Sequence, residues 1–120
     1  MSIIAVFPGQ GSQTIGMGME VSKTIKSAKN VLNEVDDALN FKLSDVMKNG
    51  NEETLRLTKN AQPALMATGI AIVRAIEEIS GKKISQIISH SAGHSLGEYT
   101  ALVSAGSISI SDAAKLLRIR

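Results

Sequence analysis

The chain has no cysteine, no tryptophan and very few aromatic residues in its 120 positions. Without cysteine, neither a disulfide framework nor a thiolate metal site can form. The only aromatic side chains are Phe7, Phe41 and Tyr99, too few to build the stacking platforms on which single-stranded nucleic acids bind. These absences exclude small disulfide-rich proteins and argue against a nucleic-acid partner.

Long apolar runs and blocks of one charge are also absent. Thirteen Lys and Arg residues are scattered among eleven acidic ones, and the formal net charge is +2. No apolar stretch approaches the roughly 18 residues that cross a bilayer. The start, Met1 to Phe7, has no basic segment of a signal peptide before Pro8 and Gly9. With 43% hydrophobic residues, we expect one globular core, no membrane contact and a cytoplasmic location.

Apolar spacing predicts an alternation of strands and helices. Ile3 to Phe7 is typical of a strand buried on both faces, and Ile84 to Ser91 indicates a second strand that ends near His90. Pro63 fits the first turn of a long helix that stops at Gly81. The helices are expected over residues 19–39 (as one or two), 52–57, 63–80, 96–105 and 110–120. Strands joined by long helical stretches favour parallel pairing and therefore a three-layer α/β fold.

One short motif carries chemistry. Gly93-His94-Ser95-Leu96-Gly97 fits Gly-x-Ser-x-Gly, the nucleophile elbow, in which a sharp strand-to-helix turn lifts a serine hydroxyl above a sheet. Side-chain carbons at the two glycine positions would strike the neighbouring strand and helix. The N–H of Leu96 would then face the oxyanion of a reaction at Ser95. The alternative is a glycine-flanked turn with no chemistry, and Glu98 is interpreted as a structural residue of the following helix.

A serine hydroxyl is a weak nucleophile without a neighbouring general base, which is usually histidine. The chain has only His90 and His94. His94 would project to a different side of the turn from Ser95, and His90 lies five residues earlier on the strand. We interpret both as packed or surface imidazoles, so the base is expected from elsewhere.

A glycine-rich loop follows the first strand. It begins like a dinucleotide fingerprint, but Thr14 stands where the third glycine belongs. Gly11 and Gly16 have the spacing of a P-loop, yet Met17-Gly18 replaces the required Lys-Ser/Thr. What remains is a tight loop whose amides could donate to an oxyanion, with Gln10 as the best candidate, or a turn without chemistry.

Together these segments resemble one family, the malonyl-CoA:acyl carrier protein transacylases and the related acyltransferase domains of polyketide synthases. The similar segments are Phe7-Pro8-Gly9-Gln10-Gly11-Ser12-Gln13, Gln62-Pro63-Ala64-Leu65, Gly93-His94-Ser95-Leu96-Gly97-Glu98-Tyr99 and Leu116-Leu117-Arg118-Ile119-Arg120. The resemblance extends over all 120 residues in order and spacing. It implies an α/β-hydrolase-like core with a parallel sheet.

The resemblance also implies an activity. Ser95 would take malonyl from malonyl-CoA as an ester, and the phosphopantetheine thiol of acyl carrier protein would then accept it, with no metal and no bound cofactor. Backbone amides of Gln10 and Leu96 would form the oxyanion hole. Arg120 would pair with the malonyl carboxylate, a role that suits a planar guanidinium. Gln62 is a weaker candidate for substrate binding.

Members of this family are roughly three hundred residues long, so residues 1–120 would be the amino-terminal portion of the acyltransferase domain. The resemblance implies that the catalytic histidine and a small ferredoxin-like subdomain lie in the remainder. Two other interpretations stay open. A serine hydrolase would share the elbow and pass the acyl group to water, and a non-catalytic remnant would keep a vestigial elbow.

Overall fold

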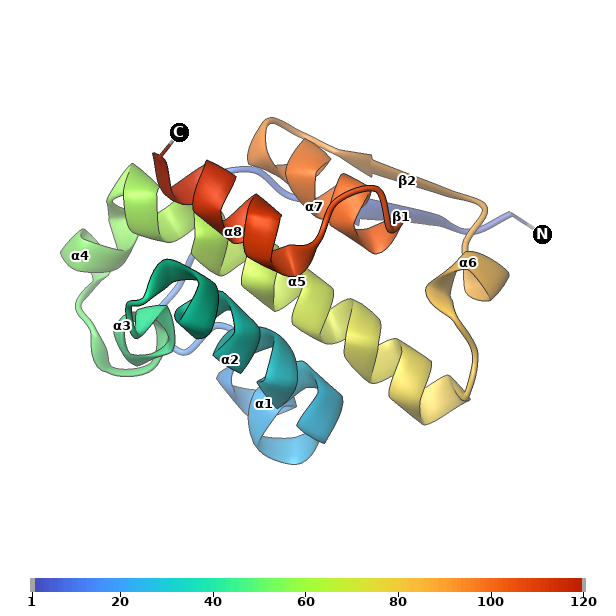
Figure 1. Cartoon of the computed structure of the whole chain (residues 1–120), viewed down its shortest axis with the longest axis horizontal. Coiled ribbons are helices and arrows are strands. Elements are labelled where there is room, and N and C mark those ends of the chain that lie inside the picture. The colour runs from blue at the N-terminus through green and yellow to red at the C-terminus, as the bar shows by residue number, and fades with distance from the viewer. Residues whose placement is uncertain (1, 120) are drawn as a thin grey trace.

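A computed structural model describes residues 2–119 and shows a helical protein with one small parallel sheet (Figure 1). The two strands are β1 (Ile4–Phe7) and β2 (His90–Gly93). The helices are α1 (Met19–Thr24), α2 (Lys26–Leu39), α3 (Leu43–Asn49), α4 (Glu52–Arg56), α5 (Thr58–Ser80), α6 (Ile84–Ile87), α7 (Leu96–Ser104) and α8 (Ile110–Ile119). The predicted parallel pairing and most of the predicted helices are confirmed.

The sheet has one covered face and one open face. β1 and β2 pair in parallel with Ile4 opposite His90 and Phe7 opposite Gly93. Phe7 is buried and packs with Val73 of α5. On the other face, Ile4 is 59% exposed and Val6 is 74% exposed. The expectation of a strand buried on both faces is therefore wrong for the described residues, because helices cover the sheet from one side only.

Helix α5 runs through the middle of the molecule, with α2 and α8 packed along it (Figure 1). Small residues make this close packing possible. Ala64, Ala67 and Ala71 of α5 are fully buried, as are Ala28 of α2 and Ala113 of α8. The larger core cluster therefore lies between helices, and a smaller one, which includes Phe7 and Val73, packs against the sheet.

The second strand begins later than predicted. Residues 84–87 form the short helix α6, and β2 covers only His90–Gly93. Ile84, Ile87 and Ile88 are three and four positions apart, which is helical spacing rather than strand alternation. The Oε1 atom of Gln86 accepts from the N–H of Lys83 at 2.9 Å and closes the first turn of α6. The prediction of a strand over this apolar run is wrong, because the spacing of its isoleucines is that of a helix.

Pro63 also lies elsewhere than expected. Helix α5 begins at Thr58, so Pro63 is inside the helix rather than in its first turn. The start of α5 is displaced because Asn60 and Ala61 already donate their N–H groups to the carbonyl of Leu57, at 2.8 Å each. Gly81 ends the helix in a left-handed conformation, as predicted.

The region between residues 40 and 58 contains more helix than the polar composition suggested. Helix α3 was not predicted, whereas α4 was. The carboxylate of Asp36 accepts from the N–H of Ser44 at 3.0 Å and from its hydroxyl, and so holds the first turn of α3. Within residues 2–119, no helix combines the length and the apolar character needed to cross a bilayer.

Candidate active site

Ser95 sits in a strained turn between β2 and α7. Its backbone has φ 53° and ψ −113°, a combination that L-residues rarely adopt. The N–H of Gly97 donates to the carbonyl of His94, and that of Glu98 donates to the carbonyl of Ser95, both at 3.0 Å. These bonds start the helix immediately after the serine, so the Ser95 residue is exposed at the helix start.

The two glycines of the motif allow backbone segments to touch. A side-chain carbon on Gly93 would lie 1.9 Å from the backbone of Gly97, and one on Gly97 would lie 2.3 Å from the carbonyl oxygen of Phe7. Neither contact could be relieved by moving a flexible side chain. The geometric reason for the glycine spacing, that larger residues would strike the helix and the neighbouring strand, is confirmed.

The loop that follows β1 lies beside the elbow. A side-chain carbon on Gly9 would come within 2.9 Å of the carbonyl oxygen of His94, so Gly9 is packed against the residue that precedes Ser95. The next residue, Gln10, is tied to the start of α5, where its Nε2 donates to Thr58 Oγ1 at 3.2 Å. The structure therefore brings together the two loops that carry the predicted oxyanion amides, those of Gln10 and Leu96.

Gln62 contacts Gln10 from the buried side. Its Nε2 donates to Gln10 Oε1 at 3.4 Å, while its own Oε1 is buried and has no hydrogen-bond partner among the described residues. A buried acceptor without a partner is costly. Gln62 thus lies next to the loop that carries the predicted oxyanion amide of Gln10, although the sequence suggested only a weak role for Gln62 in substrate binding.

The two histidines lie at opposite ends of β2, with His90 at its first position and His94 directly after its last. His90 is at the amino end of β2, opposite Ile4, and its Nδ1 is 3.2 Å from Ser89 Oγ. The ring of His94 rests against Gly9, since a side-chain carbon there would be 3.0 Å from His94 Nδ1. These positions agree with the interpretation of both as surface or packed imidazoles.

Arg120, the predicted partner of the substrate carboxylate, lies outside the described residues. Two positions earlier, Arg118 Nη1 donates to the carbonyl of Lys59 at 3.2 Å and to Asn60 Oδ1. Sequence reasoning did not single out Arg118 or Asn60. The available signal was Pro63, which cannot donate to the carbonyl four residues before it and therefore leaves Lys59 open to another donor.

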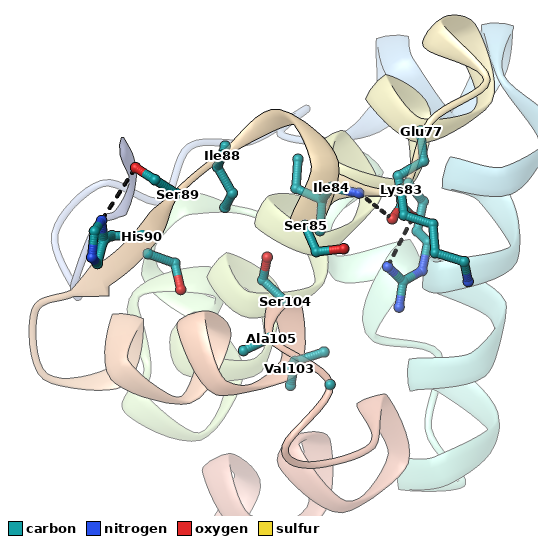
Figure 2. A pocket seen from close by; sticks show the side chains of 13 residues that line it. Glu77, Lys83, Ile84, Ser85, Ile88, Ser89, His90, Val103, Ser104 and Ala105 are labelled. Atoms are coloured by element: carbon teal, nitrogen blue, oxygen red, sulfur yellow. Dashed lines mark hydrogen bonds and ion pairs between the residues drawn. The ribbon is translucent and has the colours of Figure 1, made fainter. Parts of the chain in front are cut away.

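A hollow of about 480 Å³ lies away from the elbow. Figure 2 shows its lining from α6, the start of β2 and the end of α7, including Ser89, His90 and Ser104. Because Ser95 follows the far end of β2 and precedes α7, this hollow is at the opposite end of both elements. None of the predicted site residues that the structure describes lines it. No cluster that could hold a metal ion occurs among the described residues.

The chain is similar to known proteins in both sequence and structure. The model of the acyl transferase domain matches residues 4–120. The malonyl CoA-acyl carrier protein transacylase of Bacillus subtilis is 49% identical over 121 residues, which is 100% of this chain and 37% of that protein. The crystal structure of the acyl-carrier-protein S-malonyltransferase of Bartonella henselae has a TM-score of 0.94 at 50% identity, and the match covers 99% of this chain and 38% of that one.

A third similar structure, a malonyl-transacylase in complex with its type II polyketide synthase acyl-carrier protein, has a TM-score of 0.90 at 39% identity and is matched over 37% of its length and 99% of this chain. The chain thus spans under two-fifths of the relatives that it matches. The resemblance read from the motifs is confirmed at the level of the family. The family match over residues 4–120, together with the elbow that the glycines permit, shows that the chain belongs to the acyl transferase domain family.

Proposed function

We propose that these 120 residues supply the nucleophile and the oxyanion hole of a malonyl-CoA:acyl carrier protein transacylase. The observation that carries the proposal is the strained backbone of Ser95, with φ 53° and ψ −113°, held between two glycine contacts. Strain of this kind, of the order of 1–3 kcal/mol, is retained where the surrounding structure enforces it, and it concentrates at active sites. The similarity to named transacylases supplies the substrate class.

In the proposed reaction, the Oγ of Ser95 attacks the thioester carbonyl of malonyl-CoA while a general base takes the hydroxyl proton. The amides of Gln10 and Leu96 would donate to the resulting oxyanion. Collapse breaks the carbon–sulfur bond, and coenzyme A leaves as a thiol after receiving that proton. The phosphopantetheine thiol of acyl carrier protein then attacks the Ser95 ester by the same steps and regenerates the hydroxyl.

The remaining parts of this proposal concern sequence beyond the described residues. Arg120 would hold the malonyl carboxylate through two hydrogen bonds. A histidine of the carboxyl-terminal part, where the relatives are longer, would be the base, and that part would also complete a three-layer core and carry the small ferredoxin-like subdomain. The open sheet face at Ile4 and Val6 supports this extension, since apolar strands of parallel sheets are normally covered.

The test is intact-mass analysis of the purified chain after incubation with malonyl-CoA, with Ser95→Ala alongside. We expect a malonyl adduct that forms slowly, because the general base is not among these residues, that maps to Ser95 and that is absent from the variant. Transfer of that group to added acyl carrier protein would separate a transacylase from a serine hydrolase, which would release free malonate instead. No adduct on a chain that circular dichroism shows to be folded would contradict the proposal for these residues and favour a non-catalytic remnant.

A further inference from the structure

Arg118, near the end of α8, is held by three contacts with two other parts of the chain. Its Nη1 donates to the carbonyl oxygen of Lys59 at 3.2 Å and to Asn60 Oδ1, both in the first turn of α5. Its guanidinium carbon lies 4.4 Å from the centroid of the Phe41 ring, within the range of a cation–π interaction. These three contacts hold the half-buried Arg118 side chain in one position.

The first contact exists because of Pro63. In a continuous α-helix, the N–H of residue 63 would donate to the carbonyl of Lys59. Proline has no N–H, so this carbonyl is left open inside the helix. A guanidinium is a suitable replacement donor, since it presents several N–H groups in one plane. Arg118 therefore satisfies an acceptor that the sequence of α5 leaves unpaired.

The second contact is made to a rigid acceptor. Asn60 is 2% exposed, and its Nδ2 donates to the carbonyl of Thr54 at 2.9 Å. The amide orientation is thereby fixed, with Oδ1 directed to Arg118. Burial of Asn60 strengthens this bond, because water competes less for its Oδ1. The end of α8 is consequently fastened to the start of α5 rather than free to fray.

The same turn of α5 also holds the oxyanion loop. Thr58 and Gln62 bond the side chain of Gln10 from positions on either side of Asn60. Helices α7 and α8 are of similar length and are joined by a short connection, so α8 returns towards the start of α7, where Ser95 lies (Figure 1). The start of α5 thus fixes the oxyanion loop and the end of α8 relative to each other.

We propose that Arg118 is a positioning residue that sets the preference of this site for acyl groups bearing a carboxylate. Its bonds to Lys59 and Asn60 hold the last described turn of α8, from which the chain continues to Arg120. The inference rests on the proposed function, in which Arg120 pairs with the substrate carboxylate. Arg118 itself is not placed in contact with substrate.

The test compares acylation of Ser95 by malonyl-CoA and by acetyl-CoA in the 120-residue chain. Arg118→Met keeps the length of the side chain but removes the donors. We expect kcat/KM for malonyl-CoA to fall about tenfold, the factor associated with one charge-assisted hydrogen bond, mainly through KM. The rate with acetyl-CoA should stay within about twofold, because acetyl has no carboxylate to position. Arg118→Lys, which can still donate to both oxygens, should restore most of the preference.

Two further variants keep the test decisive. Phe41→Leu removes the ring and leaves the hydrogen bonds of Arg118, so the preference for malonyl-CoA should fall less than in Arg118→Met. This variant also tests the role of Arg118 if Arg118→Met folds poorly. Arg74→Met is the matched control. Arg74 pairs with Glu77 on the same helix, and it lies sixteen residues after Thr58, which is roughly 24 Å along α5 at 1.5 Å per residue. It should change neither rate.

The outcomes separate the two proposals. The positioning role would be overturned if Arg118→Met, with an unchanged melting temperature, lost equal rate with both substrates or lost none with either. An Arg120→Ala variant that loses the malonyl preference would still leave the proposed function standing. Full malonyl preference in Arg120→Ala, or no acylation of Ser95 in the parent protein, would instead overturn the proposed function and the inference with it.

Discussion

Gly97 lies so close to Phe7 that a side-chain carbon on the glycine would be 2.3 Å from the carbonyl oxygen of Phe7. The contact joins the helix after the nucleophile to the strand that leads into the Gln10 loop. Ser95 precedes Gly97 by two residues, and Gln10 follows Phe7 by three. The position of the elbow relative to the Gln10 loop is therefore set by a backbone contact rather than by side-chain packing.

Gly97→Ala should break this relationship. Overpacking at a site where only backbone could move is expected to lower the free energy of unfolding by about 3 kcal/mol, the upper part of the usual range, and to abolish the Ser95 adduct. Urea denaturation and intact mass give the two values. Gly81→Ala is the control, since no atom lies within 4 Å of the added carbon. Its left-handed φ should cost about 1–2 kcal/mol without affecting the adduct. An equally stable, fully acylated Gly97→Ala protein would refute this account.

The strain at Ser95 can be measured by comparing Ser95→Gly with Ser95→Ala. Both variants lack the hydroxyl and any interaction that it makes, so their difference reports the backbone strain less the extra entropy that glycine loses on folding, about 0.5–1 kcal/mol. Glycine adopts φ 53° without a steric penalty, and Ser95→Gly should be more stable than Ser95→Ala by about 1 kcal/mol or more. Thermal and urea unfolding measure the difference. Equal stabilities would mean that the strain is no larger than this entropy cost of glycine.

The elbow was predictable because its determinants are local. The glycines on either side of Ser95 occupy fixed positions in the sequence, and the close contacts that they allow follow from that spacing. The sequence also predicted the end of α5 at Gly81 and the start of the last helix, where Ser109 Oγ accepts from the N–H of Asp112 at 3.0 Å. Each of these signals lies within a few residues of the feature that it specifies.

The features that were missed depend on side-chain contacts between different helices. Asp36 holds the start of α3 through Ser44, and Arg118 meets Lys59 and Asn60 across 58 or more positions. No local pattern encodes such contacts. The error at residues 84–87 was different, since the isoleucine spacing was helical and the signal was present but read as a strand.

Gln62→Met should separate stability from activity. The substitution keeps the shape of the side chain and removes a buried oxygen that has no partner among the described residues, so the free energy of unfolding is expected to stay the same or rise by about 1 kcal/mol. It also removes the donor to Gln10 Oε1. The Ser95 acylation rate should therefore fall, by about tenfold if the oxyanion loop loosens.

Thr58→Val tests the same loop from its other anchor, because it removes the hydroxyl that accepts from Gln10 Nε2. A decrease in acylation rate similar to that of Gln62→Met would support a common effect through Gln10. If both variants acylate Ser95 at the parental rate, the side chain of Gln10 does not position its amide.

The open face of the sheet should make the isolated 120-residue chain self-associate. Ile4 and Val6 are 59% and 74% exposed on adjacent positions of that face, and strand edges beside them can pair with another chain. Each of these side chains gains at least ~1.5 kcal/mol on burial. Ile4→Thr with Val6→Thr should therefore raise the association midpoint by about tenfold or more, as measured by sedimentation velocity over a range of concentrations. Val103→Thr, at a position only 3% exposed, is the control, since it should lower stability without weakening association through this face. A parent chain that stays a monodisperse monomer at every concentration would show that the exposed strand does not drive contact between copies.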